Sequence, residues 1–167
     1  LTNKTVDFGA TDAPMNDKQE AALSGPAIHI PVTAGAVVLS YNLPGVKAAI
    51  QLTPSVLADI FLGNITSWND PKITSINKGV ALPGTAILIA HRSDGSGTTN
   101  IFTTYLAKVS PDWDSKVGKG SAVNWPTGIG GKGNEGVAGL IKQTPGAIGY
   151  IELAYAIQNA MPYASIQ

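Results

Sequence analysis

Apolar residues in this chain form short runs that alternate with amphipathic stretches, and Gly and Pro residues separate the two kinds of segment. Short apolar runs rich in β-branched residues and bounded by turn residues are typical of buried strands. We therefore expect strands at residues 5–9, 27–32, 36–42, 87–89 and 146–151.

Helices are expected where apolar residues recur three and four positions apart. Thr53 followed by Pro54 combines a capping residue with proline at the first helical position, and Gly63 would end that helix. Residues 110–135 are rich in Gly with few periodic signals, and are expected to form a long ordered loop. Further helices are expected at residues 16–23, 72–77, 101–109, 135–143 and 152–158. Because strands alternate with helices, the predicted fold class is α/β with a mostly parallel central sheet flanked by helices.

Composition narrows the classes of protein to consider. The chain has 167 residues, 44% of them hydrophobic, which suits one domain or slightly more with a sizeable core. Lys and Arg together number 11 and Asp and Glu also 11, so the formal net charge is zero. This balance argues against a nucleic-acid binder or a polybasic membrane binder. The absence of Cys excludes a disulfide scaffold, a thiolate metal site and a cysteine nucleophile.

The most informative segment covers residues 91–99 and joins an expected buried strand to the start of a helix. Such a junction presents backbone N–H groups and the positive end of the helix dipole. Its two Gly residues let an anion approach the backbone, and Ser96, Thr98 and Thr99 offer hydroxyl donors. The segment therefore predicts an oxyanion site. The alternative interpretation is an ordinary capped strand–helix turn.

Arg92, inside this segment, is the only Arg of the chain. Its guanidinium is suited to bidentate oxyanion binding, and Asp94 two residues later could hold it in place. Asp12 is either an Asx turn or cap, or a carboxylate that faces a bound anion. A carboxylate only accepts hydrogen bonds, so it would favour hydrogenphosphate over sulfate, which carries no proton near neutral pH.

Other motifs do not predict chemistry. Residues 128–133 match a dinucleotide-binding glycine pattern, but no hydrophobic strand precedes them, so no cofactor is expected. His29 and His91, without Cys, do not indicate a metal site. Ser96 lacks the nucleophile elbow, and His91 is the only nearby base, so no catalytic residue is expected.

Four stretches, at residues 6–14, 92–98, 125–134 and 145–150, resemble the periplasmic phosphate-binding proteins of bacterial high-affinity phosphate ABC transporters. The resemblance implies a type II periplasmic-binding-protein fold of two lobes that close on inorganic phosphate. Such a solute-binding protein works in the periplasm, performs no chemistry and delivers phosphate to an ABC-type membrane permease. The positions that match the family's phosphate contacts are Asp12, Arg92, Ser96, Gly97 and Thr98, and Asp94 matches the acid that pairs with the Arg.

Family members are longer than this chain, so we expect a fragment that carries only part of the site. Residues 1–31 would be the C-terminal part of lobe one up to the hinge, and residues 32–167 most of lobe two. The missing remainder of the chain would supply further ligands from lobe one.

Two alternatives remain. One is an enzyme that processes phosphoesters with the same segment, which would need a metal cluster or a base–nucleophile pair, and neither is visible. The other is a receptor for a different oxyanion such as sulfate, against which Asp12 argues.

Overall fold

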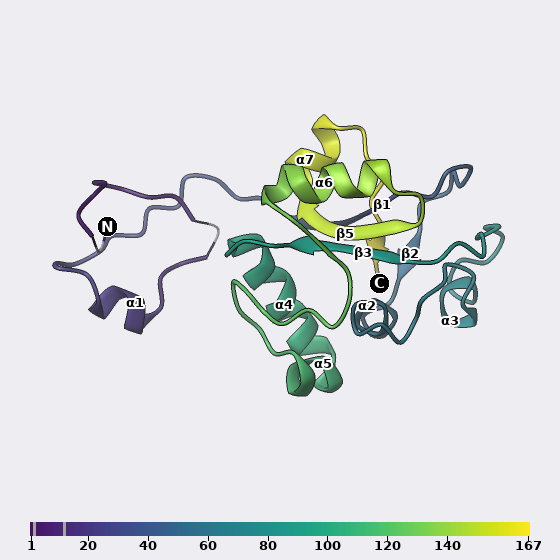
Figure 1. Cartoon of the computed structure of the whole chain (residues 1–167), viewed down its shortest axis with the longest axis horizontal. Coiled ribbons are helices and arrows are strands. Elements are labelled where there is room, and N and C mark those ends of the chain that lie inside the picture. The colour runs from purple at the N-terminus through teal and green to yellow at the C-terminus, as the bar shows by residue number, and fades with distance from the viewer. Residues whose placement is uncertain (2, 12) are drawn as a thin grey trace. The chain divides into compact units, whose positions relative to one another are not determined.

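The computed structural model of the chain describes residues 1, 3–11 and 13–167 (Figure 1). The chain divides into two compact units, Leu1–Ala34 and Gly35–Gln167. The only helix in the described part of the first unit is α1 (Asp17–Ala21). Asn16 and Gln19 form a capping box at its start, in which each side chain accepts a hydrogen bond from the other residue's backbone N–H. The helix predicted over residues 16–23 is thus confirmed.

The strands predicted at residues 5–9 and 27–32 are wrong, because the described part of Leu1–Ala34 contains no strand. None of its described residues is buried, and Ile28 and Ile30 are 85% and 73% exposed. A strand needs a neighbour for its backbone hydrogen bonds and a surface on which to pack its apolar face. The described part of this unit supplies neither, so an apolar pattern alone does not produce a strand.

The unit Gly35–Gln167 contains a sheet of four strands. Their spatial order is β1 (Val37–Tyr41), β5 (Ala147–Glu152), β3 (Leu88–Arg92) and β4 (Ile129–Gly131). The pairs β5–β3 and β3–β4 are parallel, and β1–β5 is antiparallel. The predicted α/β fold with a mostly parallel central sheet is confirmed.

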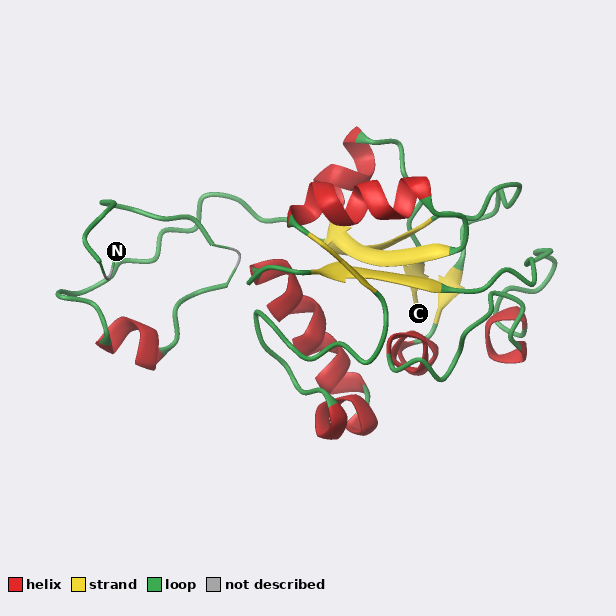
Figure 2. Cartoon of the chain, viewed as in Figure 1, coloured by secondary structure: helices red, strands yellow, loops and turns green. Residues whose placement is uncertain are grey.

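Helices cover both faces of this sheet (Figure 2). One face carries α6 (Gly133–Gln143) and α7 (Leu153–Gln158), and the other carries α2 (Pro54–Phe61) and α4 (Gly97–Val109). The remaining elements are α3 (Pro71–Thr74), α5 (Pro111–Lys116) and the parallel pair β2 (Gln51–Leu52) and β6 (Ser165–Ile166).

Helix ends follow the capping signals of the sequence. Thr53 accepts a hydrogen bond from the N–H of Val56 at 3.3 Å, Pro54 opens α2, and Gly63 follows the helix with φ +78°. The helix expected there is confirmed, with its first and last residues close to the predicted ones.

The long loop predicted over residues 110–135 is wrong at two places. Ser110 caps α5, and β4 pairs with β3. Ser110 and Pro111 repeat the cap-and-proline signal of α2, and Trp113 is fully buried. α5 is too short to show an apolar periodicity, since its one buried residue is Trp113.

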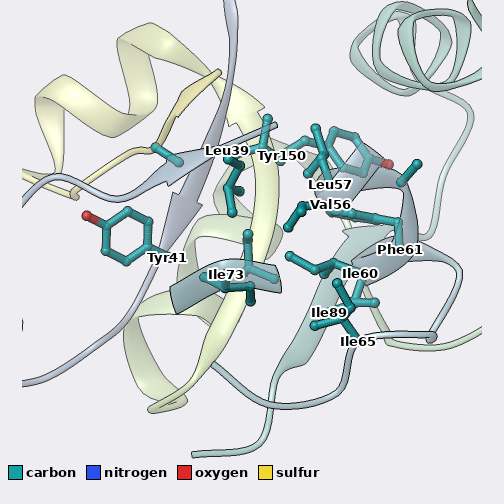
Figure 3. Packing of buried hydrophobic residues seen from close by; sticks show 14 of the residues in the cluster. Leu39, Tyr41, Val56, Leu57, Ile60, Phe61, Ile65, Ile73, Ile89 and Tyr150 are labelled. Carbon is teal, nitrogen blue, oxygen red and sulfur yellow. The ribbon is translucent and has the colours of Figure 1, made fainter. Parts of the chain in front are cut away.

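Successive side chains along a strand enter two different hydrophobic cores, one on each face of the sheet. In β5, Ile148 and Tyr150 belong to the core beside α2 and α4, whereas Ala147 and Ile151 belong to the core beside α6 and α7. Period-two alternation places successive side chains on opposite faces, so a central strand is apolar throughout. The larger core is shown in Figure 3 and includes Leu39, Tyr41, Val56, Leu57, Ile60, Phe61, Ile65, Ile73 and Ile89.

Gly149 marks a close approach within β5. A Cβ atom placed there would lie 2.5 Å from the Ala90 carbonyl oxygen and 3.0 Å from Ile141 Cδ1. A side chain at this position would push β5 away from β3 and from α6 at the same time. In contrast, a Cβ at Gly139 in α6 meets nothing within 4 Å.

We expect Gly149→Ala to destabilise the chain by about 1–3 kcal/mol, the usual cost of overpacking a rigid core. The matched control Gly139→Ala should stabilise it by about 0.5–1 kcal/mol, because Ala is the better helix former. Urea unfolding followed by Trp fluorescence measures both, since all three Trp residues lie in Gly35–Gln167. Equal effects of the two substitutions would contradict the close approach at Gly149.

Candidate functional site

The predicted anion segment lies where β3 ends and α4 begins. β3 ends at Arg92, and Ser96 caps α4 by accepting a hydrogen bond from the N–H of Thr99 at 3.2 Å. The Ser96 N–H in turn donates to the Ser121 carbonyl at 2.9 Å, which fixes the turn. The carboxyl ends of parallel strands are where open α/β sheets bind ligands, and here the N-terminal end of a long helix faces that edge.

Arg92 and Asp94 form a bidentate ion pair. Arg92 Nε donates to Asp94 Oδ1 at 2.8 Å, and Nη2 donates to Oδ2 at 2.6 Å. The Arg92 side chain is only 10% exposed. A guanidinium has five N–H donors, and this pair uses two of them. The orientation of the Arg92 guanidinium is therefore fixed by a contact within the chain itself.

The ion pair shifts the titration of both groups. The hydrogen bonds from Arg92 hold the pKa of the Asp94 carboxyl well below its usual range, and the N–H of Gly133 adds to this by donating to Oδ1 at 3.2 Å. The hydrogen bond with Asp94 likewise raises the pKa of Arg92. Because Gly133 opens α6, Asp94 also connects the ion pair to the start of a second helix.

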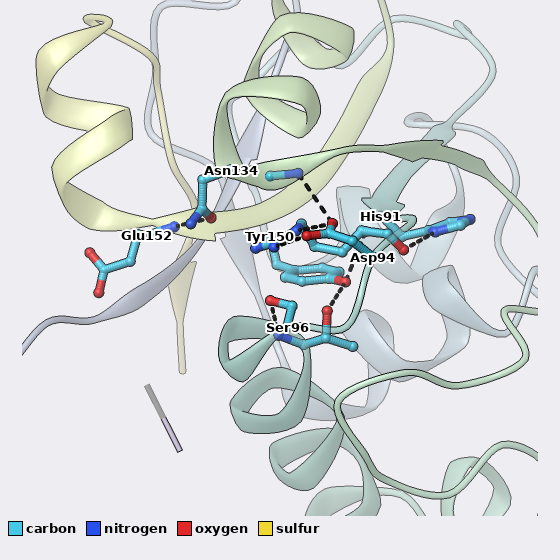
Figure 4. A network of polar contacts seen from close by, with 9 residues as sticks. His91, Asp94, Ser96, Asn134, Tyr150 and Glu152 are labelled. Carbon is cyan, nitrogen blue, oxygen red and sulfur yellow. Dashed lines mark hydrogen bonds and ion pairs between the residues drawn. The ribbon is translucent and has the colours of Figure 1, made fainter. Parts of the chain in front are cut away.

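Tyr150 is a site residue that the sequence analysis missed. Its phenol oxygen accepts a hydrogen bond from the backbone N–H of Arg92 at 3.0 Å and lies 2.7 Å from Thr99 Oγ1 (Figure 4). Tyr150 is fully buried, and burial raises its pKa, so the phenol stays protonated near neutral pH. One signal could have revealed it, since a Tyr in a buried apolar strand needs a partner for its hydroxyl.

A pocket of about 390 Å³ opens beside the ion pair and is lined by residues 91–94 and 122–125. The His91 ring stacks on Trp125 with ring centroids 4.9 Å apart and planes 14° apart. His91 Nδ1 also lies 3.0 Å from the Arg92 carbonyl oxygen. The loop before β4 thus lines the same pocket as the charged pair.

Not every predicted site residue is placed. Arg92 and Asp94 are brought together, and Ser96, Gly97 and Thr98 lie at the first turn of α4, where Ser96 and Thr98 are buried. Asp12 lies outside the described residues, so its role stays a prediction.

Across the part of the chain that the structure describes, no group of three or more His, Cys, Asp or Glu side chains could hold a metal ion. No helix in that same part is long and apolar enough to cross a membrane.

The glycine pattern at residues 128–133 has a structural explanation. β4 lies inside the pattern, and residues 125–127 before it form no strand. Gly128 has φ +114°, and a Cβ there would lie 2.6 Å from the Ile89 carbonyl oxygen. A Cβ at Gly131 would lie 2.7 Å from the backbone of Gly136 in α6. These glycines therefore let β4 pack closely against β3 and α6.

Comparison with known proteins places this geometry in context. Residues 1–165 match the family model described as "PBP superfamily domain". A relative named "Phosphate-binding protein PstS" from Xylella fastidiosa (strain Temecula1) is 52% identical over 164 residues, which are 98% of this chain and 44% of that protein. The chain therefore spans less than half the length of this curated relative.

Solved structures share the fold. A high-affinity periplasmic phosphate-binding protein bound with phosphate, PfluDING, aligns with a TM-score of 0.68 at 22% identity, covering 93% of this chain and 45% of that chain. An ABC-type phosphate transport receptor from Vibrio cholerae aligns with a TM-score of 0.57 at 19% identity, covering 79% of this chain and 46% of that chain. The predicted periplasmic-binding-protein-like fold is confirmed.

Asp94→Asn should lower the free energy of unfolding by about 1–2 kcal/mol at pH 7, where a charged hydrogen bond is lost at a partly solvated site. The folded-state pKa of Asp94 is depressed, so its contribution is fully present above the ordinary Asp pKa of about 3.9 and is lost progressively as the pH falls from there through the lower pKa of the folded state. The difference between wild type and Asp94→Asn should therefore shrink between pH 7 and pH 3 in urea unfolding.

The control for this prediction is Asp112→Asn, which removes the carboxylate of the exposed ion pair with Lys116. Exposed pairs of this kind contribute little to stability, so the urea midpoint should stay close to wild type at pH 7. A pH-independent difference for Asp94→Asn would show that Asp94 does not stabilise the fold as a carboxylate.

Proposed function

Because the chain belongs to the PBP superfamily, we propose that it carries one half of the binding site of a periplasmic phosphate receptor that delivers inorganic phosphate to an ABC-type membrane permease. The relatives support the ligand by name, since one is called a phosphate-binding protein and another an ABC-type phosphate transport receptor. In this proposal Arg92, Ser96, Gly97 and Thr98 contact phosphate.

The observation that carries the proposal is the guanidinium held bidentately beside the N-terminus of α4. Arg92 is almost buried and already oriented, so little side-chain freedom would be lost when an anion binds. Asp94 offsets the charge of Arg92, so the anion would be held by directed N–H donors and the helix dipole more than by net charge. In such binding the directions of the hydrogen bonds select the anion, and the electrostatic attraction is moderate. A moderate attraction suits a protein that must also release its ligand.

We assign the discrimination between oxyanions to Asp12. A carboxylate close to a bound anion is repulsive unless the anion donates a proton to it. Hydrogenphosphate carries such a proton near neutral pH, whereas sulfate does not. Asp12 would therefore favour the binding of phosphate and disfavour the binding of sulfate at the same position.

We also propose that residues 1–31 form the C-terminal part of lobe one up to the hinge and that residues 32–167 form most of lobe two. A complete site with micromolar affinity corresponds to about 8 kcal/mol. If about three contacts come from outside this chain, each worth ~1.5–3 kcal/mol with a charged partner, the chain alone retains millimolar or weaker affinity. The test must therefore work at millimolar phosphate.

Binding without a chemical step is part of the proposal. A nucleophile needs a general base within hydrogen-bond reach. Ser96 Oγ, the candidate hydroxyl, instead accepts a hydrogen bond from the N–H of Thr99 as a helix cap. Turnover of p-nitrophenyl phosphate by the chain would support the alternative, an enzyme that processes phosphoesters.

Arg92→Gln should remove almost all phosphate binding by the 167-residue chain. Nuclear magnetic resonance titration of the ¹⁵N-labelled chain with millimolar phosphate measures this, through the amide shifts of Gly97 and Thr98. The control Lys72→Gln removes a cation from the surface pair with Asp59 in the same unit, and should bind as wild type does. If Arg92→Gln and Lys72→Gln gave the same titration curve, Arg92 would not be a phosphate ligand.

Asp12→Asn should weaken phosphate binding and increase sulfate binding in the polypeptide that contains both lobes. Competition between the two anions in isothermal titration at neutral pH gives the preference directly. Asp7→Asn, another carboxylate of the same unit, serves as the control and should leave the preference as it is. An unchanged preference in Asp12→Asn would remove the proton-sensing role of Asp12.

A further inference from the structure

We propose that Tyr150 is the positioning residue of the anion site. Its buried hydroxyl holds the end of β3 and the first turn of α4 at the separation that phosphate recognition requires. Tyr150 acts through Arg92 and Thr99 and does not touch the ligand. This inference rests on the proposed phosphate-binding function, which it deepens.

One oxygen atom serves both elements. The Tyr150 hydroxyl accepts from the backbone N–H of Arg92 at 3.0 Å, and it lies 2.7 Å from Thr99 Oγ1. Because the phenol oxygen accepts from Arg92, its own proton is available to donate to Thr99. The residue that would bind phosphate by its guanidinium and the helix that would bind it by backbone N–H groups are thus joined through a single side chain.

The ladder between β3 and β5 stops before it reaches Arg92. Between β3 and β5 the paired positions run from Leu88 with Ala147 to Ala90 with Gly149. Arg92 lies two residues beyond this ladder, and its N–H finds the hydroxyl of Tyr150 instead of a carbonyl of β5. Tyr150 therefore extends the attachment of β3 to β5 by two residues along β3, up to the position that would carry the ligand-binding guanidinium.

The phenol ring of Tyr150 is itself fixed by its neighbours. Tyr150 is fully buried and stacks on Phe102 of α4, with centroids 4.6 Å apart and planes 22° apart. Trp125 stacks on it as well, with centroids 5.6 Å apart. The ring of Tyr150 projects from β5 and packs against Phe102 of α4 and Trp125 of the pocket wall, so its hydroxyl has little freedom. The spacing that this hydroxyl imposes on β3 and α4 is therefore rigid.

Tyr150→Phe keeps the ring and removes only the hydroxyl. The Arg92 N–H and Thr99 Oγ1 then lose a partner in a buried setting, and β3 and α4 shift to recover hydrogen bonds. We expect the phosphate dissociation constant of the chain to rise about tenfold, which corresponds to ~1.4 kcal/mol. The backbone amide signal of Arg92 should also move, because its acceptor has gone.

The control is Tyr41→Phe, which removes a hydroxyl from the same hydrophobic core. The Tyr41 hydroxyl accepts from the N–H of Ile50 at 3.3 Å and lies 3.5 Å from the Ala48 carbonyl oxygen. Both variants should unfold at lower urea concentrations than wild type. Only Tyr150→Phe should lose phosphate affinity, which separates a positioning role from general destabilisation.

Variants of Thr99 provide a second route if Tyr150→Phe folds poorly. Thr99→Val removes the other end of the bridge and should raise the dissociation constant about tenfold. Thr99→Ser keeps the hydroxyl and should bind as wild type does. The double variant Tyr150→Phe/Thr99→Val should bind no more weakly than either single variant, because both substitutions break the same connection.

The experiment is phosphate titration of the ¹⁵N-labelled chain, read at the amides of Arg92 and Gly97. The expected losses in Tyr150→Phe and Thr99→Val, with Tyr41→Phe and Thr99→Ser unchanged, support the proposal. Dissociation constants of Tyr150→Phe and Thr99→Val within twofold of wild type overturn it while the proposed function stands. A wild-type chain whose amide signals do not respond to phosphate overturns both.

Discussion

A guanidinium that is almost buried at the end of a central strand has to be paired, and the structure around β3 follows from that requirement. Unpaired, such a charge would lower the stability of the chain, because a charged group loses water here without gaining a partner. Asp94 supplies the carboxylate, and its second task, accepting the N–H of Gly133, links the pair to α6. The backbone of Arg92 is held separately by Tyr150. Arg92, at the end of β3, is thus connected to α6 through Asp94 and to β5 through Tyr150.

Several glycines lie beside the candidate site because strands and helices approach one another closely there. β4 can pair with β3 only if it also passes close to α6, and the contact between Gly131 and Gly136 leaves no space for a side chain. Gly149 has the same effect on the other side of β3. The small residues bring the backbone of neighbouring elements close together, and the polar groups of Asp94 and Tyr150 then reach across the short gaps that remain.

Sequence patterns predict this structure best where a local signal and a tertiary role agree. The caps of α2 and the buried strands β3 and β5 are examples, because neighbouring residues in the sequence are enough to predict them. The segment 27–32 has an equally good apolar pattern and forms no strand, since a strand depends on a neighbour that a pattern does not describe. Tyr150 was missed for a related reason, because its partner Thr99 lies 51 residues away. Asp94 was found because its partner is two residues away.

The mutual neutralisation of Arg92 and Asp94 has a consequence for the speed of capture. A compact ion pair acts at a distance as a dipole, and its field decays faster than that of a single charge. The chain as a whole has no net charge to add to it. An incoming anion would therefore find this surface by diffusion with little long-range attraction, and its association rate would change little as ions screen the solution. If the chain binds phosphate as proposed, the rate of capture should be similar in dilute and in concentrated salt.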